Sequence, residues 1–386
     1  MARPSSSSEA GSPRLRVDLD LPVIRDYGAL LRSGRPLIDT RAPVEFAQGS
    51  FPGAVNLPLL DDEQRKRIGT CYKQQGHEAA VRLGARLVSG EVRRARIAAW
   101  ADFLHAHPDA ALFCFRGGMR SRVTQQWLFE EAGLRCPRIA GGYKALRRFL
   151  IETIDDEAVH GDPLVLGGRT GSGKTRLLRR LANAIDLEGL ANHRGSAFGP
   201  TATPQPTPIA FENRLGVALL RAGAAGHQVK VYEDEGPNIG LVRTPAALYR
   251  RLQQAPLVVM RVSDAEREEN SLREYIDDTL ADHIAAFGET LGYERFADYL
   301  VTSLDKIRKR LGGERHARLR REMIQAIARH RVSGDRECFR PIIRALLFDY
   351  YDPMYDYQIE KKRHRILFEG GADAVLAFLD ERGTVL

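Results

Sequence analysis

One octapeptide constrains the fold of this chain more than any other feature, Gly168-Arg169-Thr170-Gly171-Ser172-Gly173-Lys174-Thr175. It matches the phosphate-loop pattern in full. The apolar residues 164–166 before it predict a buried strand, and residues 175–185 after it have the apolar spacing of a helix. A strand, a glycine-rich loop and a helix in this order form the repeating unit of a parallel α/β sheet, so the sequence predicts such a sheet here.

The composition of the loop predicts what it binds. Gly168, Gly171 and Gly173 let backbone N–H groups point inward as an anion nest at a helix N-terminus. Lys174 can reach the terminal phosphates, and the Thr175 hydroxyl can hold Mg²⁺. The loop therefore predicts a diphosphate or triphosphate ligand, without distinguishing a nucleotide from another compound of that kind.

Three acids follow a second predicted strand at residues 228–233. Glu233, Asp234 and Glu235 stand where nucleotide-binding α/β proteins place the carboxylate that orients Mg²⁺ or its water. A solvated strand end explains three acids as well, and the sequence does not choose among the carboxylates. Whether a metal is bound stays open.

A second glycine loop follows the predicted strand 111–114. It contains Cys114, Arg116 and Arg120 around a glycine pair, ahead of a predicted helix. Guanidinium charge and inward N–H groups stabilise a thiolate, so Cys114 is the candidate nucleophile. Cysteine-dependent phosphatases use a cysteine, five residues and an arginine, whereas sulfurtransferases carry a chalcogen on a similar loop. Phe113 stands where many phosphatases have histidine, which counts modestly against a phosphatase.

Composition excludes several classes of protein. The chain has 386 residues, of which 43% are hydrophobic and 28% charged, as in globular proteins. Its apolar runs are shorter than the roughly 18 residues of a membrane span. Four scattered cysteines fit neither a disulfide framework nor a metal site, and we expect a cytoplasmic protein without membrane contact. The serine-rich residues 1–17 lack the apolar segment of a signal peptide and predict a disordered tail.

Alternating strand and helix patterns predict an α/β fold in two parts. Residues 18–150 form one α/β domain, and residues 160–265 form the core of the phosphate-loop domain. Residues 266–386 are strongly charged and predict a helical C-terminal extension.

The net charge of +8 favours a polyanionic partner, and it concentrates in this extension. The bases between residues 305 and 331 predict phosphate contacts with RNA, although a solvated helix face fits them too. The named candidates are Lys306, Arg308, Lys309, Arg310, Arg315 and Arg318. His193 and Arg194, beside a run of small residues, can contact phosphate or RNA, or belong to a loop that caps a helix.

The first domain resembles a rhodanese in Asp39-Thr40-Arg41, in residues 49–56 and in the Cys114 loop. Together with the phosphate loop, the chain resembles the bacterial tRNA 2-selenouridine synthase family over nearly its whole length after the tail. Further motifs of this resemblance are residues 69–74, 141–144, 192–199, 211–213 and 233–236. The resemblance assigns Cys71, within the first of these motifs, no catalytic role.

The resemblance implies a reaction on tRNA that carries 2-thiouridine at the wobble position. Selenium from selenophosphate replaces the sulfur after geranyl diphosphate has produced an S-geranyl intermediate. It implies that the phosphate loop holds the geranyl donor and that Cys114, Arg116 and Arg120 bind selenophosphate or carry selenium. An enzyme that supplies selenophosphate would then be a further partner.

Two other functions remain open from the sequence. A phosphate-loop kinase or ATPase regulated by a rhodanese-like or phosphatase-like module fits the same two loops. An RNA-binding scaffold with vestigial loops is the third reading, and the intact Lys174, Thr175 and Cys114 speak against it.

Overall fold

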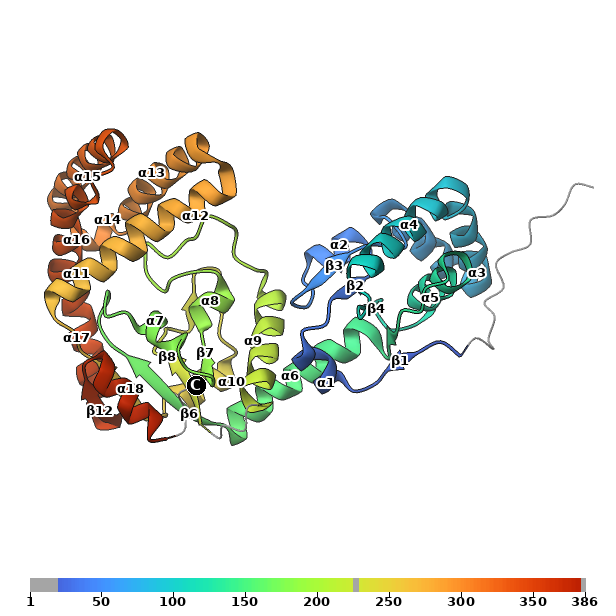
Figure 1. Cartoon of the computed structure of the whole chain (residues 1–386), viewed down its shortest axis with the longest axis horizontal. Coiled ribbons are helices and arrows are strands. Elements are labelled where there is room, and N and C mark those ends of the chain that lie inside the picture. Colours follow the sequence, from blue (N-terminus) through green and yellow to red (C-terminus); the bar gives the residue numbers. More distant parts are fainter. Residues whose placement is uncertain (1–19, 225–228, 383–386) are drawn as a thin grey trace, which may run out of the picture. The chain divides into compact units, whose positions relative to one another are not determined.

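The computed structural model describes residues 20–224 and 229–382 (Figure 1). The tail expected at residues 1–17 lies outside them. The described residues form two compact units that divide between Ile151 and Glu152. The second unit contains both the phosphate-loop sheet and the helices that follow residue 266.

The N-terminal unit is built on a five-stranded parallel sheet with the strand order β1-β5-β4-β2-β3. The strands are β1 (Val23–Ile24), β2 (Leu37–Asp39), β3 (Ala54–Asn56), β4 (Ala111–Phe113) and β5 (Arg138–Ile139). The helices are α1 (Tyr27–Ser33), α2 (Pro43–Ala47), α3 (Asp62–Leu87), α4 (Gly90–Ala106), α5 (Met119–Ala132) and α6 (Gly142–His160), whose second half belongs to the other unit.

The core of this unit lies where α4 and α5 cover the central strands. Ile38 of β2 and Leu112 of β4 are fully buried against Trp100 and Leu128. Strands of a parallel sheet are covered on both faces, so they read as short apolar runs. The buried sheet brings the ends of β2 and β4 together, and the Cys114 loop starts at that edge.

The C-terminal unit has a parallel sheet with the strand order β12-β11-β6-β8-β7. Its strands are β6 (Asp162–Gly167), β7 (Ala184–Ile185), β8 (Val229–Glu233), β11 (Leu257–Met260) and β12 (Ile366–Gly370), while β9 (Asn238–Ile239) and β10 (Val242–Arg243) form an antiparallel pair. The helices around the sheet are α7 (Lys174–Leu178), α8 (Leu187–Ala191), α9 (Pro208–Ala224), α10 (Ala246–Leu252) and α18 (Ala372–Asp380).

Successive residues of β6 point to opposite faces of this sheet. Leu164 and Leu166 pack in the core formed with α7 and α18, and Val165 packs in the core formed with α9 and α10. Burial on both faces explains the unbroken apolar run before the phosphate loop. It also places that loop at the carboxyl edge of a central strand.

A helical layer follows β11. It consists of α11 (Asp264–Leu272), a π-helical turn (Arg273–Asp277), α12 (Asp278–Phe287), α13 (Glu289–Lys306), α14 (Arg308–Leu311), α15 (Gly313–Ser333), a 3-10 turn (Arg336–Phe339), α16 (Arg340–Leu346), a second π-helical turn (Leu347–Tyr351), α17 (Asp352–Lys361) and a 3-10 turn (Arg363–Arg365). Phe296, Leu300 and Leu304 of α13 pack against Leu319 and Met323 of α15. These positions recur at helical spacing, as expected for helices with one apolar face.

The helix predicted over residues 175–185 is shorter in the structure. It ends at Leu178, and Ala184–Ile185 instead forms β7, paired with β8. Ile185 is fully buried there, and Asn183 Nδ2 donates to the carbonyl of Val229 at 2.6 Å. Sheet pairing and burial outweigh the local helix preference, which is only a weak determinant.

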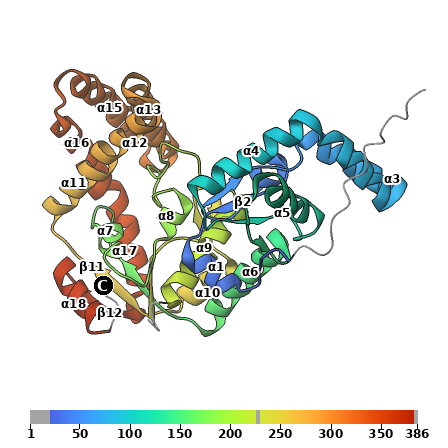
Figure 2. The same cartoon turned by 45° about the vertical axis from the view of Figure 1, so that its right-hand side comes forward.

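The extension expected to be helical also contains a strand. β12 pairs in parallel with β11, and α18 then covers the sheet with the buried residues Val375 and Leu379 (Figures 1 and 2). The strand is short and follows a basic segment, so its pattern resembles that of a charged helix end. No helix of the described residues is long and apolar enough to cross a membrane.

Candidate functional site

The first candidate site lies at the carboxyl edge of the C-terminal sheet. Leu166 of β6 pairs with Glu233 of β8, so the loop after β6 and the acids after β8 meet there. A cavity of about 260 Å³ opens at this edge. The predicted residues that line it are Gly171, Gly173, Lys174, Thr175, His193, Arg194, Glu233 and Glu235. We call it the phosphate cavity.

The side chain of Lys174 folds back onto its own loop. Its Nζ donates to the backbone carbonyl of Gly168 at 3.0 Å, so Gly168 orients the lysine. Burial lowers the pKa of Lys174, but Tyr355 and the glutamates led by Glu233 outweigh it, so the pKa is raised overall. The ammonium is therefore charged at neutral pH and available to an anion.

The loop is packed tightly against α11. Gly171 has φ of 79°, and a Cβ there would come within 2.6 Å of the carbonyl oxygen of Arg267. Only glycine fits this backbone and this contact. The buried Arg267 donates from Nε to the carbonyl of Thr170 at 3.0 Å and from Nη1 to Asp352 Oδ2 at 2.9 Å. This contact fixes the phosphate loop from the helical layer.

The structure separates the three acids after β8. The Thr175 hydroxyl donates to Glu233 Oε1 at 2.8 Å, and Glu235 also lines the phosphate cavity. Asp234 instead accepts from Lys362 Nζ at 2.6 Å and 2.7 Å. Of the three, Glu233 is therefore the carboxylate beside the threonine that can hold Mg²⁺.

These residues fit a magnesium ion in part. Glu233 Oε2 is buried without a hydrogen-bond partner in the described structure, and the Thr175 oxygen lies beside the same carboxylate. No group of three histidine, cysteine or acidic side chains among the described residues can hold a metal by itself. Mg²⁺ commonly keeps waters and substrate phosphates as ligands, which suits a site with two protein oxygens.

Glu233 and Glu235 in the cavity have pKa values above the ordinary range of a glutamate. Burial, followed by the charge of Glu188, raises the pKa of Glu235 to about 8. Burial, again followed by Glu188, raises the pKa of Glu233 well above its usual value. Without a cation, Glu235 is therefore mostly protonated at neutral pH, and Lys174, Arg176 and Arg194 line the same cavity with positive charge for an anion.

His193 and Arg194 lie on the wall of the same cavity. Burial, followed by the charge of Lys306, lowers the pKa of His193, so its ring is neutral at pH 7. Arg194 Nη1 donates to the Thr279 hydroxyl at 2.9 Å. The charge of Lys306 thus acts at the rim of the phosphate cavity.

The second candidate site is the Cys114 loop of the N-terminal unit. Cys114 is only 3% exposed, and its thiol donates to the Ser121 hydroxyl at 3.2 Å. The start of α6 supports the loop, because the N–H of Tyr143 donates to the carbonyl of Cys114 at 2.8 Å. A Cβ at Gly142, where φ is 59°, would lie 2.2 Å from that same carbonyl oxygen.

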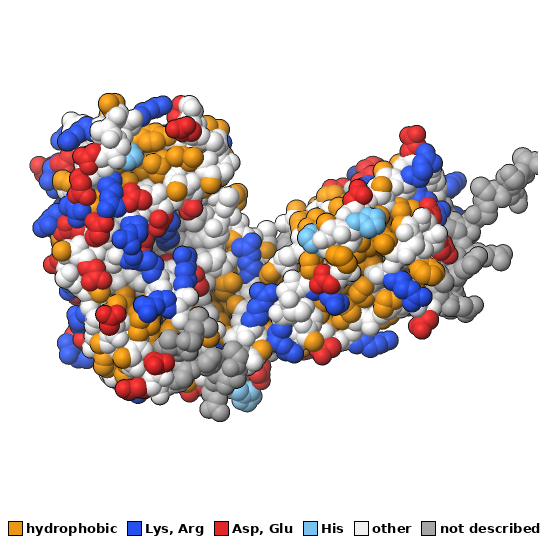
Figure 3. Space-filling view, viewed as in Figure 1, with side chains coloured by type: hydrophobic (Ala, Val, Ile, Leu, Met, Phe, Trp, Pro, Cys, Tyr) orange, Lys and Arg blue, Asp and Glu red, His pale blue; other side chains and the backbone are white. Residues whose placement is uncertain are grey.

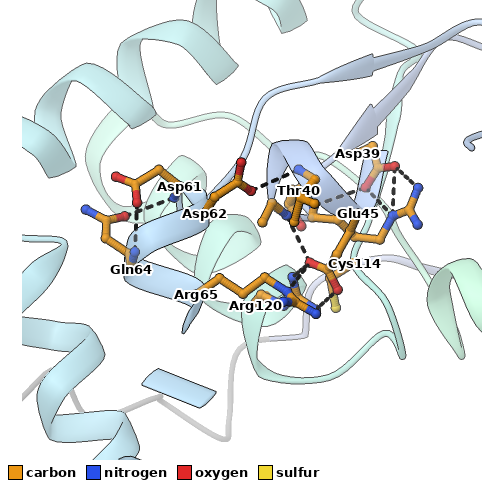
Figure 4. Close-up of polar contacts among 12 residues, drawn as sticks. Asp39, Thr40, Glu45, Asp61, Asp62, Gln64, Arg65, Cys114 and Arg120 are labelled. Carbon is orange, nitrogen blue, oxygen red and sulfur yellow. Dashed lines mark hydrogen bonds and ion pairs between the residues drawn. The ribbon is translucent and has the colours of Figure 1, made fainter. Parts of the chain in front are cut away.

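The two arginines of this loop differ in their contacts. Arg120 donates from Nη1 to Glu45 Oε2 at 2.6 Å, and Arg65 Nε lies 3.1 Å from the same oxygen (Figure 4). Arg116 is exposed, with its guanidinium over the ring of Phe115. Arg120 is therefore part of an ion-pair cluster, while Arg116 is open to solvent.

Comparison with known proteins shows the family of the chain. Residues 161–385 match a family model described as the tRNA 2-selenouridine synthase AAA domain. The chain belongs to the tRNA 2-selenouridine synthase family. Relatives with that name from Pseudomonas fluorescens (strain Pf0-1), Verminephrobacter eiseniae (strain EF01-2) and Bordetella petrii are 51%, 52% and 50% identical over 93%, 89% and 92% of this chain, and over 98%, 94% and 95% of their own. The crystal structure of an N-terminal domain from Clostridium difficile 630 is 29% identical over 33% of this chain and 98% of that one, with a TM-score of 0.31 that is too low to bear on the fold.

In this member of the tRNA 2-selenouridine synthase family, the motif Asp39-Thr40-Arg41 is part of the framework. The buried Arg41 pairs with Asp39 at 2.6 Å and donates to the carbonyl of Gly49 at 2.9 Å. Thr40 donates to the carbonyl of Phe113 at 2.8 Å, just before Cys114. These contacts hold β2 beside the Cys114 loop and supply no reactive group.

The basic segment of this family member has exposed and paired residues. Lys306, Arg308, Lys309 and Arg310 are exposed, and none of them forms an ion pair with another described residue. In contrast, Arg318 lies 3.9 Å from Glu322, and Arg315 donates to the carbonyl of Asp349. The face seen in Figure 3 mixes acidic and basic side chains over the C-terminal unit. Of the six candidate bases, the four at residues 306–310 are therefore without an ion pair among the described residues, whereas Arg315 and Arg318 have partners.

Several residues that line the cavity were missed in the sequence, among them Glu188 and Tyr355. Glu188 comes from the short helix α8, where its carboxylate accepts from the N–H of Gly195. Tyr355 comes from α17, and its ring centroid is 6.0 Å from Lys174 Nζ. A single acid gives no sequence signal. The tyrosine-rich segment 350–357 fits packing in the core as well as it fits stacking on an RNA base. Only the fold brings both side chains to the phosphate loop.

Proposed function

We propose that this chain is a tRNA 2-selenouridine synthase that acts in two steps on wobble 2-thiouridine. In the first step, the thiocarbonyl sulfur attacks C1 of geranyl diphosphate, the C–O bond breaks, diphosphate leaves, and N3 of the base releases its proton. In the second step, selenium from selenophosphate adds to C2 and the geranyl thiolate departs with a proton. Water then cleaves the P–Se bond to give phosphate. The family membership supports the overall reaction.

The phosphate cavity is our proposed site of the first step. Alkylation needs stabilisation of the negative charge that develops on diphosphate. Lys174 and Arg176 supply positive charge, and the backbone N–H groups of the loop supply hydrogen-bond donors. Thr175 and Glu233 would hold Mg²⁺, which would neutralise part of the diphosphate charge when bound.

The Cys114 loop is our proposed site of selenium chemistry. We also propose that its unit is rhodanese-like, which the parallel sheet and the loop after β4 support. Cys114 would bind selenophosphate at its selenium atom, while Arg116 and Arg120 would bind its phosphate group. Arg120 would exchange part of its contact with Glu45 for the anion.

We assign the tRNA contacts to the helical region at residues 266–386 and to the wall of the phosphate cavity. The exposed bases at 306–310 include Lys306, and its charge acts on His193 in the wall of the phosphate cavity. Such contacts would position RNA without reading its sequence. A cytoplasmic enzyme that supplies selenophosphate would complete the system.

The observation that carries this proposal is the phosphate cavity itself, where the charged Lys174 lines the same space as the hydrogen-bonded pair Thr175 and Glu233. The test incubates the full-length protein with thiolated tRNA and geranyl diphosphate, then adds selenophosphate. Mass spectrometry of the digested nucleosides should detect S-geranyl-2-thiouridine first and 2-selenouridine after the addition. Selenation without any need for geranyl diphosphate would remove the first step, and the absence of both products would reject the synthase.

A kinase or ATPase is the competing function. It would release phosphate from ATP without tRNA, at a rate that depends on Lys174. The synthase proposal predicts no such release above the rate of a Lys174→Ala variant.

A further inference from the structure

Helix α3 is a hairpin that neither proposed site uses. Its backbone turns at Gly76, where φ is 82° and ψ is −175°. Gln64 Nε2 donates to the carbonyl of Leu87 at 3.4 Å, and the Ile68 side chain reaches Gly84, so residues 62–75 and 77–87 run antiparallel. Figure 2 shows α3 extending away from the sheet of its unit.

A groove of about 440 Å³ lies between the two arms of this hairpin. Lys66 and Arg67 line it from the first arm, and Arg82 and Arg86 line it from the second. Among the lining residues, Glu63 is the one carboxylate, so four cations face a single acid. Thr70 and Gln74 add hydrogen-bonding groups. We call this the hairpin groove.

The cations of the hairpin groove are available to a ligand. Lys66, Arg67 and Arg86 are exposed, and in residues 20–224 and 229–382 none of them forms an ion pair. Arg82 lies 3.6 Å from Glu78, but the two side chains are 61% and 92% exposed, and an exposed pair of this kind contributes little. An approaching anion therefore meets cations that have no strong internal partner.

The tip of the hairpin carries an exposed aromatic side chain. Tyr72 is 59% exposed, and its ring centroid is 6.3 Å from that of His77. Burying a tyrosine would be the usual result of folding, and this one is left in solvent beside Lys73. A flat ring next to bases is the combination that stacks on an unpaired nucleobase.

We propose that the hairpin groove binds backbone phosphates of tRNA, with Tyr72 stacking on an unpaired base. This inference rests on the proposed function for the identity of its ligand. Lysine and arginine side chains on two fixed arms suit successive phosphates, which need charge but no base-specific contact. The motif at residues 69–74 then shapes the tip of an RNA-binding element, and Cys71 is a groove residue and not a catalytic one.

Salt dependence of tRNA binding tests the proposal. The double variant Lys66→Ala/Arg86→Ala of the full-length protein should bind tRNA more weakly. The slope of log affinity against log salt should fall by about 2, because each phosphate contact contributes about 1. The matched control, Arg94→Ala/Arg135→Ala, removes the same charge from exposed positions of the same unit. It should keep the slope of the unaltered protein.

A second measurement needs no substitution in the groove. Cys71 lines the groove and is partly exposed, so bound tRNA should slow its alkylation by N-ethylmaleimide several-fold. Equal salt slopes for the two double variants, or an alkylation rate that tRNA leaves unchanged, would overturn the inference. In that event, a wild-type protein that still forms 2-selenouridine would leave the proposed function intact.

Discussion

Glu235 gives the phosphate cavity a pH dependence. Its pKa of about 8 in the folded chain lies far above the ordinary value of 4.5, because burial and Glu188 penalise the charged form. The folded state therefore holds a proton that the unfolded chain loses between these two values. Stability linked to this proton is complete below the unfolded pKa and is lost as pH rises through the folded one.

We predict that the melting temperature of the free protein falls between pH 5.5 and 8.5. Glu235→Gln should flatten this fall, because the amide cannot lose the proton. Thermal unfolding monitored by circular dichroism across this range provides the measurement. Asp234→Asn is the matched control at the neighbouring residue, which faces Lys362 instead of the cavity. A Glu235→Gln variant with the same pH dependence as the wild type would contradict the assignment.

At the scale of single elements, the meeting of the Cys114 loop and α6 depends on glycine. Gly142→Ala should distort the loop, because its Cβ would lie 2.2 Å from the carbonyl oxygen of Cys114. The left-handed backbone alone costs about 1–2 kcal/mol for a residue other than glycine. We expect lower stability in urea unfolding and a loss of selenation.

Gly69→Ala supplies the comparison for that variant. Gly69 lies in α3, and a Cβ there would meet nothing within 4 Å. Alanine at a helix position should leave the stability unchanged or raise it by up to about 1 kcal/mol. If Gly142→Ala matched Gly69→Ala in stability, the close approach would not matter.

Local sequence patterns predicted the elements whose own residues form a recognisable pattern. The phosphate loop, the helix after Cys114 and the strands β4, β6 and β8 are visible as glycine spacing or apolar runs. The strands that the sequence did not predict depend on pairing with strands that are distant in sequence. β7 forms because Ala184 pairs with Val231, and β12 forms because Ile366–Gly370 reaches β11.

The residues of the candidate sites also fall into two groups, those that a local motif predicts and those that only the fold brings to the site. Lys174 and Thr175 follow from the phosphate-loop motif, and the three acids follow from a strand end. The structure then selects Glu233 as the acid that bonds to Thr175. Arg267, Glu188 and Tyr355 reach the phosphate loop from other parts of the chain. Their positions are set by packing of the helical layer, which a single sequence does not specify.

At the scale of the whole molecule, each unit carries one glycine-rich loop, and we propose a separate chemical role for each loop. We propose that Lys174 assists the departure of diphosphate and that Cys114 acts on selenium. Two variants can therefore separate the steps, since each removes one side chain from a different unit. Folding of both variants is checked by thermal unfolding.

The most direct measurement follows nucleosides by mass spectrometry for Lys174→Ala and Cys114→Ala, each supplied with either 2-thiouridine tRNA or S-geranylated tRNA. Lys174→Ala should fail to geranylate but should still convert the S-geranylated tRNA to 2-selenouridine with selenophosphate. Cys114→Ala should geranylate normally and fail in the second conversion. Failure of both folded variants at the same step, or normal geranylation by Lys174→Ala, would contradict the division of work between the two loops.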